Sequence, residues 1–461
     1  MRTGSGTENP RLAHGVSDGF TPELRAAGHV RLVVGQFRGR EQLRGPAQDA
    51  RVLDVAVVGC GTGGPAAGAL LAQLGHRVRI YEALPDPGPV GAGLLLQPTG
   101  RAVLEQLGVL GPILSLGARV DRLRGVTTRG VPVLDLAYSD LRPGLFGLGV
   151  QRGALFDALR GAALAAGCEM LPDHKIVQMR RDDPLATLRD SRGREHGPFD
   201  LVVVCDGARS ALRRAFPHLV LRDRPYDWGA AWAVLPDEDG RFDGTLAQWY
   251  EGTGAMLGIL PVGRATADGP RCVGLFWSLA TREFEAFRAS SLAQFKARAN
   301  ALTGGATTEL LGGLHYSEQF ILATYHDVMM RRTFDGPVVF IGDAAHATSP
   351  QLGQGANLAL VDAAVLAVTL TSALASDRAR DPTHHRVERA LREFDAKRRP
   401  RHRYYQRVSR WLTPWFQSDH EALAPVRDLI FGPMCRVPYT KREMLLGLAG
   451  VKSGLFSADP L

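Results

Sequence analysis

The tightest constraint on the fold is a short apolar strand that runs into a glycine-rich turn and then into a helix. The segment 53–59 (LDVAVVG) has the length and composition of a buried strand, 65–75 (PAAGALLAQLG) those of a buried helix, and 76–82 (HRVRIYE) those of a second strand. Three glycines in the pattern G-x-G-x-x-G occupy the turn between the first strand and the helix. This order and spacing predict a βαβ unit in a parallel sheet.

Each glycine of this turn has a separate role in a dinucleotide-binding unit. Gly59 permits the tight turn, Gly61 lets a pyrophosphate approach the backbone, and Gly64 lets the helix pack closely on the strand. The helix N-terminus offers free N–H groups and a partial positive charge to that pyrophosphate. Glu82 ends the second strand, where a carboxylate can bind a ribose hydroxyl. A lone triplet would indicate only a turn, but the whole context predicts a dinucleotide site and favours FAD or NAD over NADP.

Composition argues against several other classes of protein. The chain has 461 residues and a formal net charge of +8. We attribute this charge to an arginine-rich bias and to attraction for anionic cofactors, so we expect no nucleic-acid partner. The five cysteines lie far apart without a CxxC pair, which favours a cytoplasmic location and gives no sign of a disulfide framework or metal site. No run approaches the roughly 18 apolar residues of a membrane span, and no signal peptide is apparent.

Two further motifs place acidic residues at the ends of buried strands. The strand-like FDLVVVC is followed by DGARSALRR (206–214), and VVFIGDAAHATSPQLGQGANLAL (338–360) ends a strand in Gly342-Asp343 before a glycine loop opens a helix. A carboxylate at such a place can accept hydrogen bonds from a buried polyhydroxyl chain. A helix N-terminus nearby favours negative charge on a bound ring.

In order and spacing, these three motifs resemble the group A flavoprotein monooxygenases, the single-component aromatic hydroxylases of the p-hydroxybenzoate, salicylate and ubiquinone-pathway hydroxylase type. The resemblance runs from about residue 53 to 370 and matches the motif D-G-x-x-S-x-x-R through Asp206, Gly207, Ser210 and Arg213. The chain departs from the family at Gly88, where an arginine is common, and at Pro98-Thr99-Gly100, where PNA or PNG is common. These departures concern details of FAD contact.

The resemblance implies an α/β fold: a Rossmann-type FAD-binding domain of the glutathione-reductase-like type, an interleaved mixed β-sheet substrate domain and C-terminal helices. It implies a role for Asp343 at a ribityl hydroxyl, for Arg152 at the flavin's linker, and for the glycine loop at the pyrimidine edge. The expected cofactor-binding residues are Gly59, Gly61, Gly64, Glu82, Arg152, Asp206, Asp343, Gly353, Gly355, Ala356 and Asn357.

Domain boundaries follow from the same alignment of motifs. Residues 1–50 are expected to form a partly disordered extension with one possible strand at HVRLVVGQF. The FAD-binding domain is expected in three pieces, and the substrate-binding sheet and the C-terminal helices in the rest. The ranges are 51–120, 150–218 and 336–375 for the FAD-binding domain, 121–149 and 219–335 for the substrate domain, and 376–461 for the helices.

The reaction implied by the resemblance uses NADH or NADPH as a transient co-substrate and O2, and it hydroxylates an aromatic or polyketide-like molecule through a flavin 4a-hydroperoxide. The flavin does the chemistry, so no catalytic side chain is assigned, and His346 is expected to support its loop. Tyr250, Trp232 and Pro350 are candidates for the substrate pocket, although plain core packing explains aromatic residues equally well. Alternation along TLAQWYEG places Gln248 and Tyr250 on one face of a strand.

Other readings keep the fold or the cofactor but change the function. The same fold could carry out epoxidation, oxidative decarboxylation, halogenation or reduction, although the halogenase motif G-W-x-W-x-I-P is absent. A non-catalytic FAD-binding regulatory protein is the second alternative. The basic, aromatic segment 403–416 (RYYQRVSRWLTPWF) is expected to pack over the pocket in preference to a membrane surface. A monomer or a homodimer fits equally well.

Overall fold

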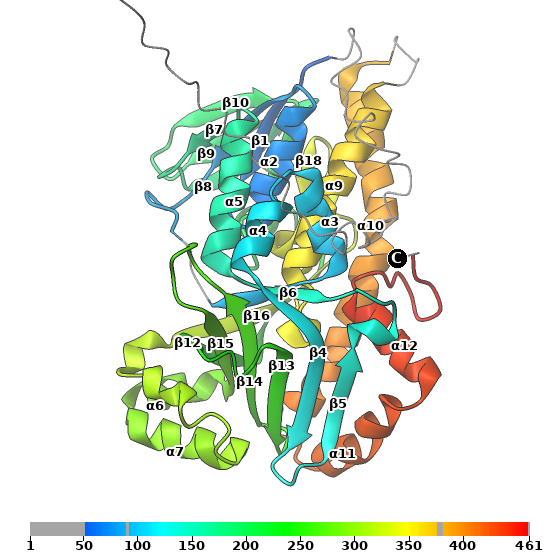
Figure 1. Cartoon of the computed structure of the whole chain (residues 1–461). Helices are drawn as coiled ribbons and strands as arrows, with labels where there is room; N and C mark the ends of the chain where they lie inside the picture. Colours follow the sequence, from blue (N-terminus) through cyan, green and yellow to red (C-terminus); the bar gives the residue numbers. More distant parts are fainter. Residues whose placement is uncertain (1–50, 89–91, 376–380, 460–461) are drawn as a thin grey trace, which may run out of the picture.

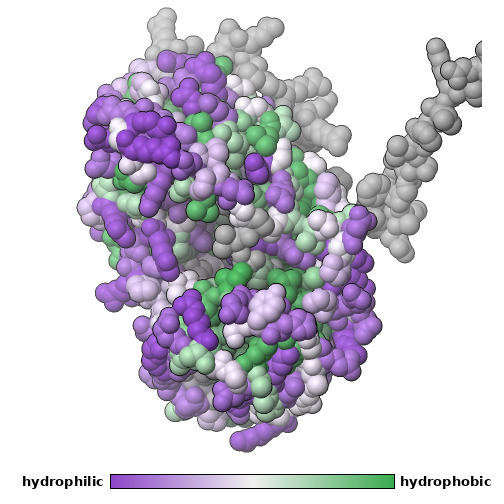
Figure 2. Space-filling model, turned by 90° about the vertical axis from the view of Figure 1, so that its left-hand side faces the viewer, coloured by the Kyte–Doolittle hydropathy of each residue, from purple (hydrophilic) through white to green (hydrophobic). Residues whose placement is uncertain are grey.

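The computed structural model describes residues 51–88, 92–375 and 381–459. The predicted extension at 1–50, with its possible strand, lies outside these residues. The described part has two halves, with α9 and α10 reaching from the upper half toward the lower one (Figure 1). On the face shown in Figure 2, hydrophobic residues gather just below the waist between the halves, while the outer surfaces are mostly hydrophilic.

The upper half is built on a six-stranded sheet with the order β17-β18-β11-β1-β2-β7. The central strand β1 is completely apolar after its first residue, and it pairs in parallel with β2 on one side and β11 on the other. Burial on both faces explains the continuous valine-rich runs. The strands are β1 Asp54–Val58, β2 Arg77–Tyr81, β7 Glu169–Leu171, β11 Leu201–Val204, β17 Phe334–Asp335 and β18 Val338–Phe340.

The helices of this half confirm the predicted βαβ unit. The helix α2, Gly63–Gln73, begins directly after β1 and leads to β2. Two further helices, α5 (Arg152–Ala165) and α9 (Gly355–Leu374), contact α2. The short helices α3 (Pro98–Gln106) and α4 (Leu110–Leu116) complete the layer. The opposite face of the sheet carries a small sheet of β8 Ile176–Asp182, β9 Leu185–Asp190 and β10 Glu195–Phe199.

The helix α9 bears on the expectation that the chain has no membrane span. By length and composition its 20 residues could cross a membrane, although no such segment was expected. In the folded chain 83% of its apolar window is buried, and it contacts α2, α3 and α10. A helix that is apolar on all sides is a core helix when other elements surround it.

The lower half is a mixed sheet with the order β16-β12-β15-β14-β13-β4-β6-β3, and β5 pairs with β4. The pairing of β13 with β4 is parallel, and most others are antiparallel. Gly93–Leu96 falls in the range 51–120 assigned from the sequence to the FAD-binding domain, yet it forms β3 of this sheet. The other strands are β4 Ala118–Thr127, β5 Pro132–Ala137, β6 Gly147–Gln151, β12 Val220–Pro236, β13 Gly244–Glu251, β14 Ala255–Gly263, β15 Cys272–Ala280 and β16 Ile321–Met330.

Helices cover both faces of this mixed sheet. An apolar cluster that includes Leu257, Trp277 and Phe295 packs one face against α7 (Leu292–Thr303), with α6 (Phe284–Ala289) beside it. The other face is turned toward the upper half and the C-terminal helices. These are α10 Thr383–Phe416, α11 Leu423–Met434 and α12 Pro438–Leu448. The long helix α10 therefore contributes to both halves of the molecule (Figure 1).

Candidate functional site

The turn between β1 and α2 has the geometry that its glycines predict. Gly59 has φ +107°, and a Cβ there would run into the carbonyl oxygen of Cys205. A Cβ on Gly64 would overlap the carbonyl oxygen of Gly59, so only glycine lets the helix approach the strand this closely. Gly61 differs, because a Cβ there meets no protein atom within 4 Å. The backbone at Gly61 borders open space in which a phosphate can lie.

The carboxylate of Glu82 is held beside this turn by two backbone donors. One oxygen accepts from the N–H of Cys60 and the other from the N–H of Leu84, both at 2.9 Å. Each carboxylate oxygen can accept more than one hydrogen bond, so both retain capacity for a ribose hydroxyl. Glu82 therefore lies beside the turn, and its role at a ribose hydroxyl stays a prediction.

A cavity of about 320 Å³ brings the three motifs together. The predicted residues Gly61, Glu82, Arg152, Asp343, Gly355 and Ala356 line it. Gly59, Gly64, Asp206, Gly353 and Asn357 do not line it and instead shape the segments behind its walls. Its two carboxylates stand on separate motifs, and its glycines at 61 and 207 leave space where a Cβ would project. These features fit an elongated cofactor with hydroxyl donors near each end and a pyrophosphate between them, as in FAD.

The motif at 206–213 braces the middle of this cavity. One carboxylate oxygen of Asp206 is buried and has no hydrogen-bond partner among the described residues, and burial raises the pKa of this carboxyl. A buried polar atom without a protein partner takes its hydrogen bond from water or from a ligand. Arg213, itself buried, donates to the carbonyls of Ala208 and Ala344 at 2.7 and 2.8 Å. It thereby ties this loop to the residue that follows Asp343.

The glycine loop before α9 is fixed by Asn357. Its side-chain oxygen accepts from the N–H of Gln97 at 2.8 Å, and its amide donates to the carbonyls of Leu95 and Gly353 at 3.2 and 3.1 Å. All three partners belong to the protein, so Asn357 acts as a positioning residue for the loop. Gln97 is fully buried and its side-chain nitrogen has no partner among the described residues. This donor could not be predicted from the sequence, because a glutamine after an apolar strand carries no distinctive pattern.

Asp343 is the residue of this loop whose removal should affect the cofactor alone. It is exposed in the cavity wall at the start of α8 (Asp343–His346). We expect Asp343→Ala to weaken FAD binding by roughly tenfold or more, the value of a lost hydrogen bond to a charged acceptor, with little change in stability. Flavin fluorescence during titration of the apoprotein measures this. Asp239→Ala, at an acid that is 78% exposed in a distant loop, is the control. Equal FAD affinity of Asp343→Ala and wild type would refute the role.

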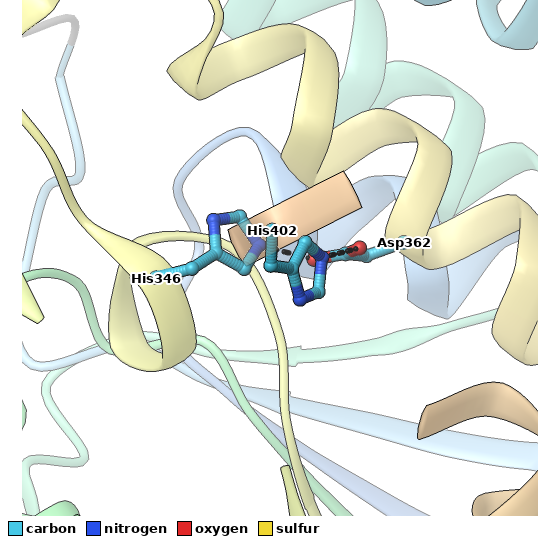
Figure 3. Close-up of side chains that lie close together, drawn as sticks. All are labelled: His346, Asp362 and His402. Carbon is cyan, nitrogen blue, oxygen red and sulfur yellow. Dashed lines mark hydrogen bonds and ion pairs between the residues drawn. The ribbon is translucent and has the colours of Figure 1, made fainter. Parts of the chain in front are cut away.

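Behind this loop, a buried carboxylate collects four donors from two segments of the chain, 342–346 and 398–402, and Figure 3 shows the two histidines among them. Asp362, on α9, accepts from the N–H of Gly342 at 3.0 Å and from Nε2 of His346 at 2.6 Å. Its other oxygen accepts from Nε of Arg398 at 2.6 Å and from Nε2 of His402 at 2.8 Å. The rings of His346 and His402 lie 3.9 Å apart. His346, expected to support the loop, thus connects it to α9 and α10.

His346, Asp362 and His402 have ligand atoms close enough to hold a metal ion. The surroundings favour a hydrogen-bonded network, because Arg398 already places a permanent positive charge on the shared carboxylate. All the lone pairs of that carboxylate are engaged by the four donors. We therefore assign this group, hereafter the Asp362 network, to positioning of the Gly342–Asp343 turn.

The Asp362 network predicts sensitivity to acid. Burial lowers the pKa of His402 to about 3. Burial acts to raise the pKa of Asp362, but His402, His346 and Arg398 outweigh it and hold that pKa well below its usual value. In the unfolded chain His402 regains a pKa near 6.5, so the unfolded state binds more protons below that pH. The contribution of His402 to the free energy of unfolding is therefore fully present above about pH 6.5 and is lost progressively as the pH falls toward 3.

We expect the free energy of unfolding to drop by about 2 kcal/mol between pH 7 and pH 4.5 from this site alone. Urea unfolding across that range measures the change. His402→Gln keeps a nitrogen donor but removes the titration, so its profile should be flatter, while His218→Gln, at a histidine whose side chain is 56% exposed, should follow the wild type. Parallel profiles for His402→Gln and wild type would contradict the assignment.

A second cavity, of about 850 Å³, lies between the mixed sheet and the C-terminal helices. Apolar residues of β4 and β5, Gln248 and Tyr250 of β13, and residues of α10, α11 and α12 line it. Gln248 and Tyr250 share one face of the strand as predicted, and Trp249 packs on the other face with the α7 cluster. The hydroxyl of Tyr250 donates to the side-chain oxygen of Gln248 at 3.0 Å.

Two glycines let aromatic rings pack close to the sheet next to this second cavity. Gly125 and Gly258 stand opposite Gln248 on the two neighbouring strands. A Cβ on Gly125 would lie 2.6 Å from the ring of Tyr250, and a Cβ on Gly258 would overlap the ring of Phe276. Aromatic rings can lie flat on the sheet only because these positions lack side chains. Neither glycine was predicted to have this role, although a glycine inside a strand is a signal of close approach.

The other two candidates for the substrate pocket lie outside this cavity. Trp232 shares the sheet face with Phe276, at 5.0 Å between ring centroids, and its indole nitrogen donates to Tyr325 at 3.3 Å. Pro350 is exposed, next to Gln351 and Leu352, which do line the cavity. Of the three, only Tyr250 is in the cavity wall, and the substrate roles of all three remain predictions.

Comparison with known proteins identifies the family. The FAD binding domain family matches residues 52–400, well over half of the chain. The chain belongs to this family. Among relatives of this FAD binding domain protein, the aurachin C monooxygenase/isomerase of Stigmatella aurantiaca is 30% identical over 344 residues, which are 69% of this chain and 81% of the relative. The 3-amino-4-hydroxybenzoate 2-monooxygenase of Streptomyces cremeus is 26% identical over 392 residues, 79% of this chain and 88% of the relative.

Solved structures agree with this family. PqsL of Pseudomonas aeruginosa, described as a probable FAD-dependent monooxygenase, superposes with a TM-score of 0.70 at 24% identity, over 82% of this chain and all of PqsL. HpxO of Klebsiella pneumoniae, solved with FAD and uric acid, gives 0.68 at 20% identity, over 86% of this chain and 97% of HpxO. The predicted fold class is confirmed. The FAD binding domain protein described here is an FAD-dependent monooxygenase.

Proposed function

We propose that this monooxygenase hydroxylates an aromatic or polyketide-like molecule in the second cavity, using FAD in the first cavity, NADH or NADPH as reductant, and O2. The observation that carries the proposal is the segment 351–356. Gln351 and Leu352 line the second cavity, while Gly355 and Ala356 line the first. One short loop therefore separates the two cavities. A flavin ring bound against this loop in the first cavity would lie next to a substrate bound in the second cavity.

The residues that would hold FAD are those of the three motifs. The backbone at Gly61 and the N-terminus of α2 would bind the pyrophosphate, Glu82 a ribose hydroxyl, and Asp343 a hydroxyl of the ribityl chain. Arg152, at the first position of α5 and exposed in the cavity wall, offers a cation to the linker. When bound, FAD supplies the redox chemistry of the reaction.

The chain's own contribution in the second cavity is to orient the substrate and exclude water. Leucines of β4 and β5 and the aromatic residues Phe416 and Phe431 form apolar walls. Burial raises the pKa of Tyr250, so its phenol stays protonated and keeps its hydrogen bond to Gln248. Among the described residues, the side-chain nitrogen of Gln248 donates a hydrogen bond only to the sulfur of Met256, at 3.9 Å, which leaves an amide donor for a substrate oxygen.

The names of the relatives support an aromatic substrate. Those relatives act on 3-amino-4-hydroxybenzoate and on aurachin C, and PqsL was solved with 2-aminobenzoylacetate. The five cysteines are all free and most are buried, which supports the cytoplasmic location that we propose.

The proposal is tested by substrate-stimulated oxidation of NADH and NADPH. The FAD-loaded protein is screened with phenols, aminobenzoates, quinolones and aromatic polyketides, and products are analysed by mass spectrometry under ¹⁸O2. We expect one compound class to stimulate oxidation and to gain one ¹⁸O atom. An FAD-loaded protein that oxidises neither nicotinamide with any aromatic compound, or whose products carry no ¹⁸O, would refute hydroxylation at this site.

A further inference from the structure

One helix lines the second cavity with a row of positive charge. Arg399, Arg403 and Arg407 of α10 follow one another at intervals of four residues, and all three are in the cavity wall. Residues four apart on a helix lie on the same face, one turn above another. The predicted packing of segment 403–416 over the pocket thus brings arginines as well as aromatic rings to the cavity.

Two of these arginines have no counter-charge of their own. Arg399 pairs with Asp395, but neither Arg403 nor Arg407 makes an ion pair or hydrogen bond with any residue that the structure describes. Every other arginine of α10 contacts a carboxylate or a backbone carbonyl. The missing partners are therefore specific to the cavity face of this helix.

The remaining charge in the cavity wall does not compensate. Glu443 is the carboxylate that lines this cavity, and its oxygen pairs with Nζ of Lys452 at 2.6 Å. Burial, together with the nearby cations Arg403 and Arg332, lowers the pKa of Arg399. An excess of positive charge thus acts on neighbouring cations as well as on any ligand.

The cavity has an apolar wall on the sheet and a basic wall on α10. Leu123, Leu134 and Leu136 belong to the sheet side. Arg407 is exposed, as are Trp411 and Leu455, which line the same cavity, so we place its mouth at these residues. A volume of about 850 Å³ is in the upper range for small-molecule sites. A single small ring would leave much of it unfilled.

We propose that the substrate carries an anionic group, such as a carboxylate, beside its aromatic body, and that Arg403 and Arg407 bind this group at the mouth of the second cavity. The apolar body then extends inward toward Gln248 and Gln351. Guanidinium groups bind carboxylates through paired hydrogen bonds, which fixes direction as well as affinity. This inference rests on the proposed function, because it takes the second cavity to be the substrate site.

A matched pair of ligands tests the inference without any turnover. Naphthalene-2-carboxylate and naphthalene-2-carboxamide have nearly the same shape, but only the first is charged. Isothermal titration calorimetry with FAD-loaded protein at low salt should show tighter binding of the carboxylate. The double variant Arg403→Gln/Arg407→Gln should weaken its binding by roughly tenfold or more, while binding of the carboxamide changes less than twofold.

Arg392→Gln is the control, because Arg392 lies on the same helix but pairs with Glu388 at 2.6 Å and does not line the cavity. Val408→Phe, which adds bulk at the cavity wall, should weaken both ligands and so locate them. Equal affinity of wild type for both ligands would overturn the inference, and so would equal losses of both in the double variant. Because no turnover is measured, these results are independent of the ¹⁸O experiment that tests hydroxylation.

Discussion

Replacing Asp362 by alanine is expected to lower the free energy of unfolding by about 3 kcal/mol or more and to weaken FAD binding at the same time. The carboxylate is fully buried and receives donors from Gly342, His346, Arg398 and His402. Its removal leaves the buried guanidinium of Arg398 without its charged partner. It also frees the N–H that holds the Gly342–Asp343 turn. Urea unfolding of the apoprotein and FAD titration measure the two effects.

Asp121→Ala is the matched control, because Asp121 pairs with Arg119 at the surface with half of its side chain exposed, and such pairs contribute less than about 1 kcal/mol. An Asp362→Ala protein with wild-type stability would contradict the network. A protein that is destabilised but binds FAD with unchanged affinity would confine Asp362 to a structural role away from the cofactor.

This network also explains how the C-terminal helices are coupled to the cofactor loop. Helix α10 contributes Arg398 and His402 to the buried carboxylate. The next residue after each of them, Arg399 and Arg403, lines the second cavity. One helix thus contacts both the support of the Gly342–Asp343 turn and the wall of the larger cavity. A shift of α10 on ligand binding would move the Gly342–Asp343 turn, because the hydrogen bonds that join them through Asp362 are short and buried.

The sequence predicted those parts of the site that depend on local geometry. The glycine turn, Glu82 and the Asp343 loop are each set by a few consecutive residues whose backbone can adopt only a few arrangements. Their meeting in one cavity follows from strand order, since the carboxyl ends of parallel strands share one edge of a sheet. Alternation along β13 placed Gln248 and Tyr250 on the cavity face for the same local reason.

The parts that the sequence could not predict depend on contacts between distant segments. Nothing near Asp362 distinguishes it from any polar residue in an apolar helix, since its partners lie 16 and 20 residues before it and 36 and 40 residues after it. From the sequence, Arg403 and Arg407 are expected to be ordinary solvent-exposed charges, and only the packing of α10 against the sheet places them in the wall of a cavity. Trp232 and Tyr250 are both aromatic residues in strand-like segments, and only the order of strands in the sheet shows that Tyr250 lines the cavity and Trp232 does not.

Gly61→Val is expected to abolish FAD binding in a protein that still folds. A Cβ at Gly61 meets no protein atom within 4 Å, whereas the neighbouring positions Gly59 and Gly64 collide with backbone. The added side chain therefore occupies only the space next to the backbone where the pyrophosphate approaches. We expect the affinity for FAD to fall by roughly a hundredfold or more, equivalent to about 2.7 kcal/mol, while the free energy of unfolding of the apoprotein changes by less than about 0.5 kcal/mol.

Flavin fluorescence and urea unfolding of the same apoprotein preparation separate these two effects. Gly161→Val, at an exposed position of α5 where a Cβ also meets nothing within 4 Å, is the control for adding valine to a glycine. It should bind FAD as the wild type does. If Gly61→Val retains FAD with wild-type affinity, the pyrophosphate does not pass this turn. The glycine motif would then serve the fold only. No protein atom requires a glycine at position 61, and this result would show that the cofactor does not require one either.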